Sequence, residues 1–172
     1  MKNMIKPILV LTLICLVVSV LLAAVNSMTE PIIDEREAQL ASDACARLIP
    51  GGTGFEQIDI PDGLPSTIKA IYRESSGQGY VYKMVTTGYK SGFQIMCGIS
   101  ADGKITATEV IANNETPGYG SRTAEKSYTD LYIGYTSELG GEELLLSGAT
   151  ISSRAFKSAI ADAFTAHQAL TR

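Results

Sequence analysis

The sequence predicts an α+β protein with an N-terminal transmembrane helix, a stalk helix, an antiparallel sheet of about four strands or more, and a C-terminal helix packed on that sheet. Three observations support this prediction: an apolar run near the N-terminus, alternating segments joined by glycine-rich turns, and a helical pattern at the C-terminus. With 172 residues, the chain has room for one modest domain beside an anchor. We expect a cytoplasmic N-terminus and anchor over residues 1–27, and the folded domain with its stalk helix over residues 28–172.

The apolar run extends almost without interruption over residues 8–25. About 18 such residues suffice to cross a bilayer as a helix. Lys2 and Lys6 precede the run, and the acidic residues Glu30 and Asp34 follow it, which places the N-terminus in the cytoplasm. A cleaved signal peptide is the alternative, because the run ends in small residues. We favour an uncleaved, single-pass anchor in the cell membrane that leaves the folded domain outside the cytoplasm.

Local patterns predict the elements of the folded domain in order. A helical pattern begins at Thr29, which is a suitable N-cap, and ends at Pro50-Gly51-Gly52. Alternating apolar residues then predict strands that pair as hairpins, and Asp102-Gly103 is a strong turn signal. The predicted strands cover residues 68–73, 80–87, 93–99 and 104–111. At residues 152–170, an apolar stripe that includes Phe156 and Ile160 predicts the C-terminal helix.

Composition and charge exclude several classes of function. The net charge of −4 provides no basic surface for nucleic acid. His167 is the only histidine, which argues against a histidine-based catalytic triad or a multi-histidine metal site. No set of acid, base and nucleophile makes the chain a self-sufficient catalyst. Cys45 and Cys97 lie outside the membrane run on ordinary apolar positions, and a disulfide between them stays an open question.

The run Ser147-Gly148-Ala149-Thr150 stands between two predicted elements. Residues 144–146 are apolar and predict a short buried strand, and the C-terminal helix follows the run. Gly148 and Ala149 leave little side chain in the way, so the backbone can approach a ligand closely.

The amino end of the C-terminal helix predicts an anion site. Ser152 and Ser153 are good N-cap residues, and the unpaired amides and positive dipole end of a helix attract negative charge. Thr150 places a hydroxyl beside this end. Together these residues predict a phosphate next to a threonine at the start of the helix, with an ordinary strand-to-helix turn as the alternative.

Two motifs resemble those of a known family. The SGAT run followed by Ile-Ser-Ser resembles the flavinylation motif of the FMN-binding domain that RnfG and NqrC share, in the Rnf complex and in the sodium-translocating NADH:quinone reductase. The earlier run Glu115-Thr116-Pro117-Gly118-Tyr119-Gly120 predicts a tight loop in which Gly118 and Gly120 permit a positive φ. This loop resembles the ETPG-type loop of the same family.

The resemblance implies an FMN-binding fold in which FMN is attached covalently to Thr150 through a phosphoester. It also implies that the FMN is bordered by residues from both motifs. These are Ser147, Gly148, Ala149 and Ser152 from one motif, and from the other the loop Glu115 to Gly120, with Glu115, Thr116, Pro117 and Gly118 as its principal contacts.

The same resemblance implies an electron-carrier subunit of an Rnf-type complex, which moves electrons between ferredoxin and NAD and couples them to Na⁺ or H⁺ transport. Such a chain would act beside other membrane subunits, and a flavin transferase would attach its FMN. Two alternatives stay open: an NqrC-like subunit of the quinone reductase, and a membrane-anchored scaffold domain without flavin. Leu144 supports the scaffold, because the family pattern usually has an acidic residue at that position.

Overall fold

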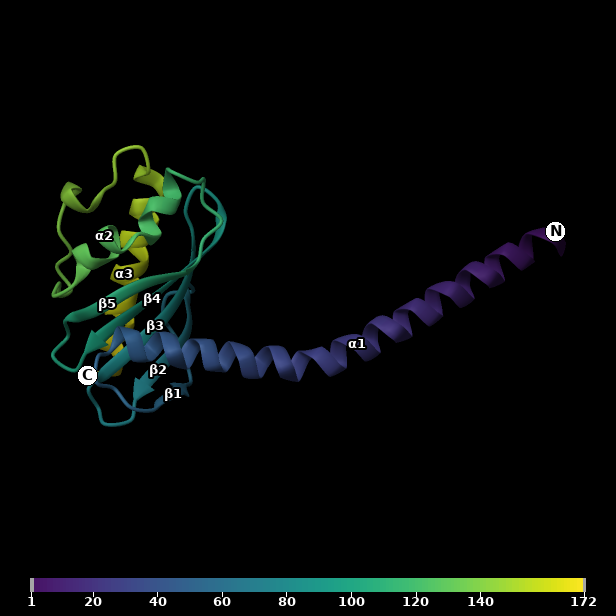
Figure 1. The fold of residues 1–172 in the computed structure, drawn as a ribbon, viewed down its shortest axis with the longest axis horizontal. Coiled ribbons are helices and arrows are strands. Elements are labelled where there is room, and N and C mark those ends of the chain that lie inside the picture. Colours follow the sequence, from purple (N-terminus) through teal and green to yellow (C-terminus); the bar gives the residue numbers. More distant parts are fainter. Residues whose placement is uncertain (1, 172) are drawn as a thin grey trace. The chain divides into compact units, whose positions relative to one another are not determined.

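The computed structural model describes residues 2–171, without the side chains of residues 2–7, 28 and 30–38. The chain forms two compact units, Met1–Ala41 and Ser42–Arg172. The helices are α1 (Lys2–Leu48), η1 (Gly120–Ala124), α2 (Lys126–Thr129), η2 (Asp130–Tyr132), η3 (Glu142–Leu144) and α3 (Thr150–Leu170). The strands are β1 (Phe55–Ile58), β2 (Ile68–Glu74), β3 (Gly79–Thr87), β4 (Ser91–Ser100) and β5 (Ile105–Ala112) (Figure 1).

The five strands form one antiparallel sheet in the order β1-β2-β3-β4-β5, so each strand pairs with its neighbour in the chain. Short connections favour this meander, because consecutive antiparallel strands need only a tight turn between them. The predicted sheet and the α+β class are confirmed. The sheet has one strand in addition to the four that the alternating pattern predicts. This strand, β1, comes first in the chain and lies between Gly52 and Thr67.

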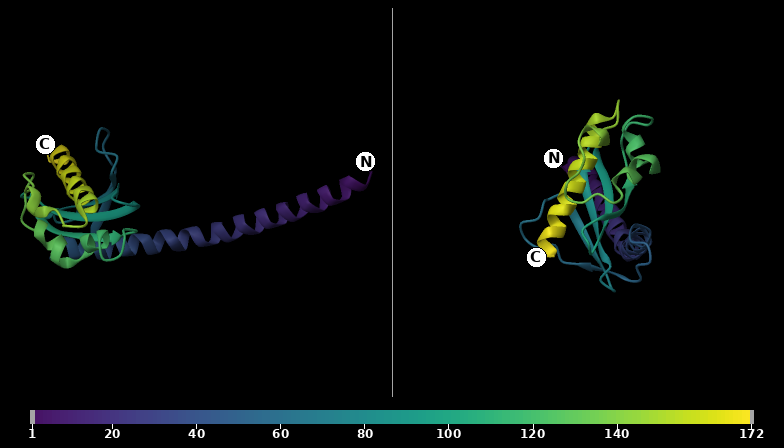
Figure 2. Two further views of the ribbon diagram at one scale, coloured as in Figure 1. Left: turned by 90° about the horizontal axis from the view of Figure 1, so that it is seen from above. Right: turned by 90° about the vertical axis from the view of Figure 1, so that its left-hand side faces the viewer.

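The sheet has two apolar faces, one covered by α3 and the other by the end of α1 that belongs to the second unit. Figure 2 shows α3 on one side of the sheet and the last part of α1 on the other. The α3 side buries Tyr82, Phe93, Ile95, Phe156 and Ile160. The α1 side buries Ala44, Cys45, Leu48, Val81 and Met96. The predicted packing of the C-terminal helix on the sheet is thus confirmed.

The two cysteines of the folded unit lie on opposite faces of the sheet. Cys97 belongs to the α3 side, and Cys45 belongs to the α1 side. Both thiols are unpaired and buried, and burial raises the pKa of Cys45 to about 12. The open question of a disulfide is therefore answered, because the sheet stands between the two sulfur atoms.

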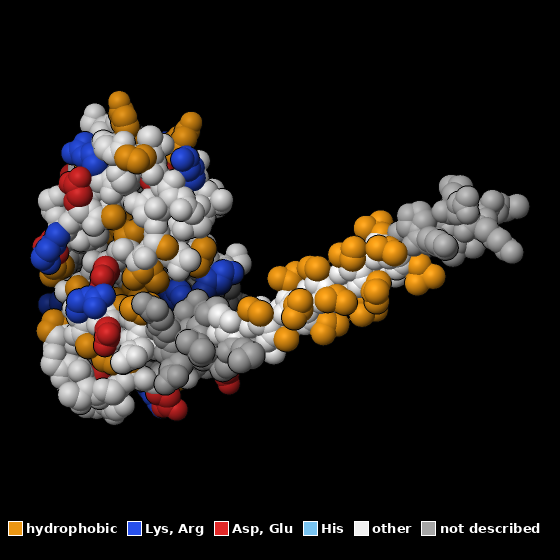
Figure 3. Space-filling view, turned by 45° about the vertical axis from the view of Figure 1, so that its right-hand side comes forward, with side chains coloured by type: hydrophobic (Ala, Val, Ile, Leu, Met, Phe, Trp, Pro, Cys, Tyr) orange, Lys and Arg blue, Asp and Glu red, His pale blue; other side chains and the backbone are white. Residues whose placement is uncertain are grey.

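The N-terminal part of α1 has the length and composition of a membrane anchor. Its segment Ile8–Ser27 contains 20 residues with a mean hydropathy of 3.2. At 1.5 Å per residue this segment measures about 30 Å, the thickness of a bilayer's hydrocarbon core. Its large apolar side chains are exposed, and Figure 3 shows those on the face turned to the viewer. The hydroxyl of Thr12 donates to the carbonyl of Ile8 at 2.9 Å, so it adds no unpaired polar group.

The helix start suggested at Thr29 is wrong, whereas the expected continuation of the apolar helix into the stalk is confirmed. The helix α1 continues through this residue, and the hydroxyl of Thr29 donates to the carbonyl of Val25 at 2.8 Å. Threonine does this inside helices, so its presence does not by itself mark a helix start. The helical spacing also predicts one buried face of the stalk, with Ile33, Leu40, Ala41, Ala44 and Leu48. Ala44 and Leu48 are buried, Leu40 is exposed, and Ile33 lies outside the described side chains.

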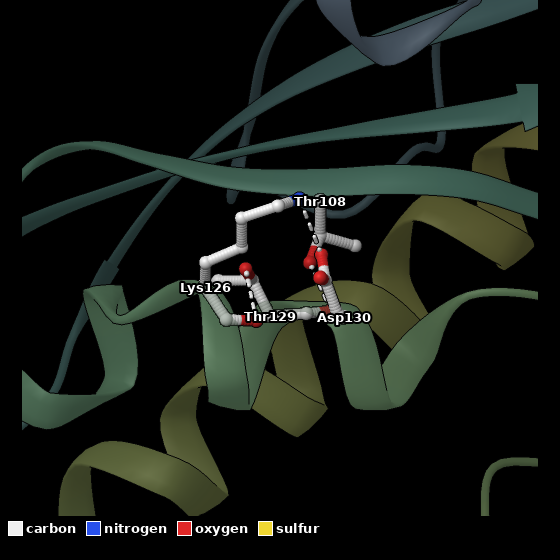
Figure 4. A network of polar contacts seen from close by, with 4 residues as sticks. All are labelled: Thr108, Lys126, Thr129 and Asp130. Atoms are coloured by element: carbon white, nitrogen blue, oxygen red, sulfur yellow. Dashed lines mark hydrogen bonds and ion pairs between the residues drawn. The ribbon is translucent and has the colours of Figure 1, made fainter.

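A short helical segment connects the sheet to α3. The hydroxyl of Thr108 on β5 donates to the carbonyl of Thr129 at 3.0 Å, and Lys126 pairs with Asp130 at 3.0 Å (Figure 4). The buried hydroxyl of Tyr128 donates to the carbonyl of Leu144 at 2.9 Å. These bonds fix the chain that leads to the start of α3.

Residues 144–146 do not form the predicted strand. Leu144 ends η3, and its side chain is buried in the core on the α3 side of the sheet. A short apolar run indicates burial but does not distinguish a strand from another buried segment.

The turn between β2 and β3 is organised by a buried carboxylate. Glu74 is 1% exposed, and its Oε2 accepts hydrogen bonds from the amide of Gln78 at 3.0 Å and the hydroxyl of Ser76 at 2.7 Å. These bonds, the one from Gln78 first, lower the pKa of Glu74 to about 2. Because the pKa is lower in the folded state than in the unfolded state, the carboxylate stabilises the fold above the unfolded pKa and loses this contribution as the pH falls toward 2.

We therefore expect Glu74→Gln to lower the thermal unfolding midpoint of the full-length protein in detergent at pH 7. The deficit should shrink as the pH is lowered through the range between about 4 and 2, because the wild type loses its charge there. Circular dichroism melts of both proteins across this range measure the difference. A deficit that stays constant with pH would show that the charge of Glu74 does not carry the effect.

Candidate functional site

Two segments that are far apart in sequence meet at a cavity of about 440 Å³. One is the loop between β5 and η1, and the other is the start of α3. The volume lies within the roughly 300–1,000 Å³ of typical small-molecule sites. Among the predicted FMN contacts, the cavity is lined by Glu115, Thr116, Gly148, Ala149, Thr150 and Ser152. Pro117, Gly118 and Ser147 belong to the same segments but do not line it.

The cavity also has an apolar rim, and only one of its residues, Tyr119, belongs to a motif that is expected to border FMN. The rim is formed by Tyr89, Tyr119 and Ile151, which are 67%, 62% and 57% exposed. Tyr119 lies in the predicted loop, whereas Tyr89 comes from the β3–β4 turn. Ile151 is detectable in principle, because it is an apolar residue that falls outside the buried stripe of α3. His167 does not line the cavity; it is buried, and its Nδ1 lies 3.0 Å from the hydroxyl of Tyr82.

Thr150 is the first residue of α3, and its side chain is exposed. The N-cap residue is Ala149, and no side chain caps the helix. The first amides of an α-helix have no partner within the helix, and the helix dipole adds partial positive charge there. The 21-residue helix therefore presents an open, positively polarised end beside the hydroxyl of Thr150.

Ser152 and Ser153 are not the N-cap residues that the sequence suggests. The helix begins earlier, at Thr150, so both serines lie within its first turn. The hydroxyl of Ser153 donates to the carbonyl of Ala149 at 3.0 Å, and that of Ser152 donates to Oε2 of Glu115 at 2.6 Å. Ser153 thus bonds to the backbone of its own helix, and Ser152 attaches the helix to the loop that contains Glu115. Neither serine caps the amino end of the helix.

Glu115 joins the three segments around the cavity. It is 5% exposed, and its Oε1 accepts from the amide of Lys90 at 3.0 Å. Its Oε2 accepts from the amide of Tyr89 at 3.2 Å as well as from Ser152. A buried carboxylate is costly unless such donors replace its water. Glu115 therefore holds the β3–β4 turn and the start of α3 against its own loop.

Gly148 allows the turn that leads into α3. The amide of Ala149 donates to the carbonyl of Leu146 at 3.0 Å, which closes a turn with Gly148 at its third position. The φ of Gly148 is 79°, as type II turns require at this position, and glycine adopts this value without strain. The sequence suggests Gly148 only as a point where the backbone can approach a ligand. The structure shows that Gly148 also forms the turn that brings Thr150 to the wall of the cavity.

Gly120 is needed for its size and not for a positive φ. Only Gly118 of the two loop glycines has a positive φ, at 78°. A Cβ on Gly120 would lie 2.5 Å from Oε2 of Glu115 and 2.6 Å from the hydroxyl oxygen of Ser152. Any larger residue at this position would therefore force Glu115 and Ser152 apart.

We expect Gly120→Ala to destabilise the fold by about 1–3 kcal/mol, the usual cost of overpacking. Gly141→Ala is the matched control, because a Cβ there would meet only the carboxylate end of the flexible Glu143 side chain, at 3.1 Å. Thermal unfolding of both variants measures the difference. Equal unfolding midpoints would mean that the Glu115–Ser152 contact tolerates expansion.

Comparison with known proteins identifies the class of this site. Residues 88–165, which contain the loop, the cavity and most of α3, match the family model described as "FMN-binding domain". The match covers the elements that bring Tyr89, Glu115 and Thr150 together.

Relatives extend the similarity to nearly the whole chain. The G subunit of the Na(+)-translocating ferredoxin:NAD(+) oxidoreductase complex of Acetobacterium woodii is 30% identical over 95% of this chain and 91% of its own. The G subunit of the ion-translocating oxidoreductase complex of Methanosarcina acetivorans is 31% identical over 92% of both chains. That of Shewanella baltica is 26% identical over 95% of this chain and 89% of its own. This chain therefore belongs to the family of G subunits of ion-translocating oxidoreductase complexes, which includes an FMN-binding domain.

Proposed function

We propose that this chain is the electron-carrying G subunit of a membrane-bound ion-translocating oxidoreductase complex, and that it holds FMN through a phosphoester to Thr150. One observation carries this proposal: Thr150 is exposed at the uncapped amino end of α3, in a cavity that also includes the loop from Glu115 to Gly120. The attachment forms one bond between Oγ1 of Thr150 and the phosphorus of FMN while the phosphoanhydride bond of a flavin dinucleotide donor breaks, and the leaving nucleotide takes the proton of the hydroxyl. Relative to the bare chain, the product gains the mass of FMN less one water. A flavin transferase is the expected catalyst.

The residues present fit the two chemical ends of FMN. The open amides at the start of α3 suit the remaining phosphate charge. On the exposed rim, Tyr119 and Ile151, which lie beside Thr150, offer apolar surface to a flat ring system. When bound, FMN supplies the electron transfer, and the protein supplies position and electrostatics.

The family supports a place among other membrane subunits. The Acetobacterium woodii relative is named as a subunit of a Na⁺-translocating ferredoxin:NAD⁺ oxidoreductase complex. We propose the same type of reaction for the complex that contains this chain. The segment Ile8–Ser27 of α1 would span the membrane once. Lysines at positions 2 and 6 favour a cytoplasmic N-terminus, with the FMN on the other side of the membrane.

A C-terminal alkaline phosphatase fusion tests this orientation, because the reporter folds to an active form only outside the cytoplasm. We expect an active fusion. Activity from a reporter that works only in the cytoplasm, such as green fluorescent protein, would reverse the proposed orientation.

An intact-mass spectrum tests the proposed cofactor. The full-length protein, coexpressed with a flavin transferase, should carry an added mass equal to FMN less one water. The purified protein should be yellow and should bleach on reduction. A colourless protein with the mass of the bare chain would instead favour the membrane-anchored scaffold without flavin.

The second candidate function is a membrane-anchored scaffold domain without flavin, and the residue that favours it is Leu144. It stands where the family pattern usually has an acidic residue, and its side chain is buried in the core. A transferase that needs an exposed acid there would not find one. The NqrC-like alternative has less support, because the relatives named above are all G subunits.

A further inference from the structure

Three large apolar side chains are exposed to solvent together at the rim of the cavity. Tyr89, Tyr119 and Ile151 are each more than half exposed, and all three border the same cavity as Thr150. Single exposed apolar residues are ordinary, but several around one cavity indicate a surface that a ligand covers.

Tyr119 is the rim residue that is held beside the attachment site. Its amide donates to the carbonyl of Thr116 at 3.1 Å, and its own carbonyl accepts from the amide of Arg122 at 3.0 Å. Its Cδ1 lies 3.8 Å from the point that a Cβ on Gly148 would occupy. The aromatic ring therefore lies against the glycine that directly precedes Ala149 and Thr150.

Tyr89 is held by different contacts from Tyr119. It comes from the β3–β4 turn, and the contact described for it is the backbone bond from its amide to Glu115. Its side chain is the most exposed of the three. The two tyrosines thus line one cavity from separate segments, and only Tyr119 lies against the turn that carries the attachment residue.

We propose, on the basis of the proposed function, that Tyr119 is the positioning residue that stacks on the isoalloxazine ring of the FMN attached to Thr150, and that Tyr89 does not. Aromatic pairs favour offset-stacked or tilted arrangements, and because the backbone of Tyr119 is already held by hydrogen bonds, stacking has only its two side-chain torsions to order.

Stacking on a tyrosine has an optical consequence. A flavin in its excited state takes an electron from a phenol in contact with it, and the electron then returns, so light emission is lost without net oxidation of either partner. Phenylalanine keeps the shape of the ring but lacks the phenol. Tyr119→Phe and Tyr89→Phe therefore form a matched pair, each removing one exposed hydroxyl from the same cavity.

The experiment measures fluorescence yield per covalently bound flavin in the full-length protein, produced with a flavin transferase and held in detergent. We expect the native wild type to be strongly quenched, Tyr119→Phe to be several-fold brighter, and Tyr89→Phe to match the wild type. In denaturant all three proteins should emit equally, because unfolding separates the ring from the phenol. Tyr119→Leu should be as bright as Tyr119→Phe.

The outcomes separate this inference from the proposed function. Covalent flavin whose native yield is unchanged by Tyr119→Phe, or is raised instead by Tyr89→Phe, would overturn the role of Tyr119 and leave Thr150 as the attachment site. A wild type without covalent flavin would overturn both.

Discussion

We expect Thr150→Ala to remove the proposed covalent flavin and to leave the fold intact. The side chain of Thr150 is exposed at the first position of α3, and alanine is well tolerated there. We therefore expect a change in unfolding free energy within about 0.5 kcal/mol, as for other exposed positions. In contrast, the loss of the hydroxyl removes the only atom at this position that can bond to phosphorus. The flavin band on a denaturing gel should disappear completely.

Two further substitutions isolate the hydroxyl. Thr150→Val keeps the branched shape and should also be colourless, whereas Thr150→Ser keeps the hydroxyl and should retain the flavin band. Circular dichroism should give the same unfolding midpoint for all of these proteins once flavin has been left out by omitting the transferase. A flavin band that persists in Thr150→Ala and Thr150→Val would place the attachment on another residue.

Glu115→Ala produces the largest expected loss of stability. It leaves two backbone amides, those of Tyr89 and Lys90, and the buried hydroxyl of Ser152 without their acceptor. Each unpaired buried group costs about 1–3 kcal/mol, and relaxation toward water offsets part of the sum. We expect a loss of about 3 kcal/mol, with a much lower flavin content, because the loop and the start of α3 lose their connection.

Thermal unfolding and flavin content measured on the same preparation test this expectation. Glu138→Ala is the matched control: Glu138 is an exposed glutamate, and its substitution should change the unfolding free energy by no more than about 0.5 kcal/mol. Ser152→Ala removes one of the three donors and should lie between the control and Glu115→Ala. A Glu115→Ala protein that unfolds like the Glu138→Ala protein would show that the loop is held by other contacts.

Much of the fold is predictable because its signals are local. The apolar run of the anchor, the alternation in β2 to β5 and the stripe on α3 each reflect neighbours in one element. The boundaries are less predictable. Thr29 and Ser152 have side chains that suit an N-cap, yet both lie inside helices and donate hydrogen bonds there. Of residues 144–146, Leu144 is buried as expected and the other two are partly buried, but the segment is not a strand.

The site is predictable as two motifs but not as an arrangement. Residues 115–120 and 147–150 are visible in the sequence, and the cavity brings them together. The partners of Glu115 are not visible, because Lys90 and Ser152 lie 25 and 37 residues away in the sequence. From the sequence alone, Tyr89 is expected only to pack beside the sheet, because a tyrosine in a turn is not part of a periodic pattern. Such contacts depend on how the sheet and α3 pack, which local patterns do not determine.

Fragmentation of one tryptic peptide tests the central claim most directly. Cleavage after Lys126 and Arg154 releases residues 127–154, which contain Thr150 together with several other hydroxyl-bearing residues such as Ser147 and Ser152. In protein made with a flavin transferase, we predict that the mass of FMN less one water lies on Thr150 alone. The same added mass on any other residue of the chain, or its absence from the whole protein, would contradict the account.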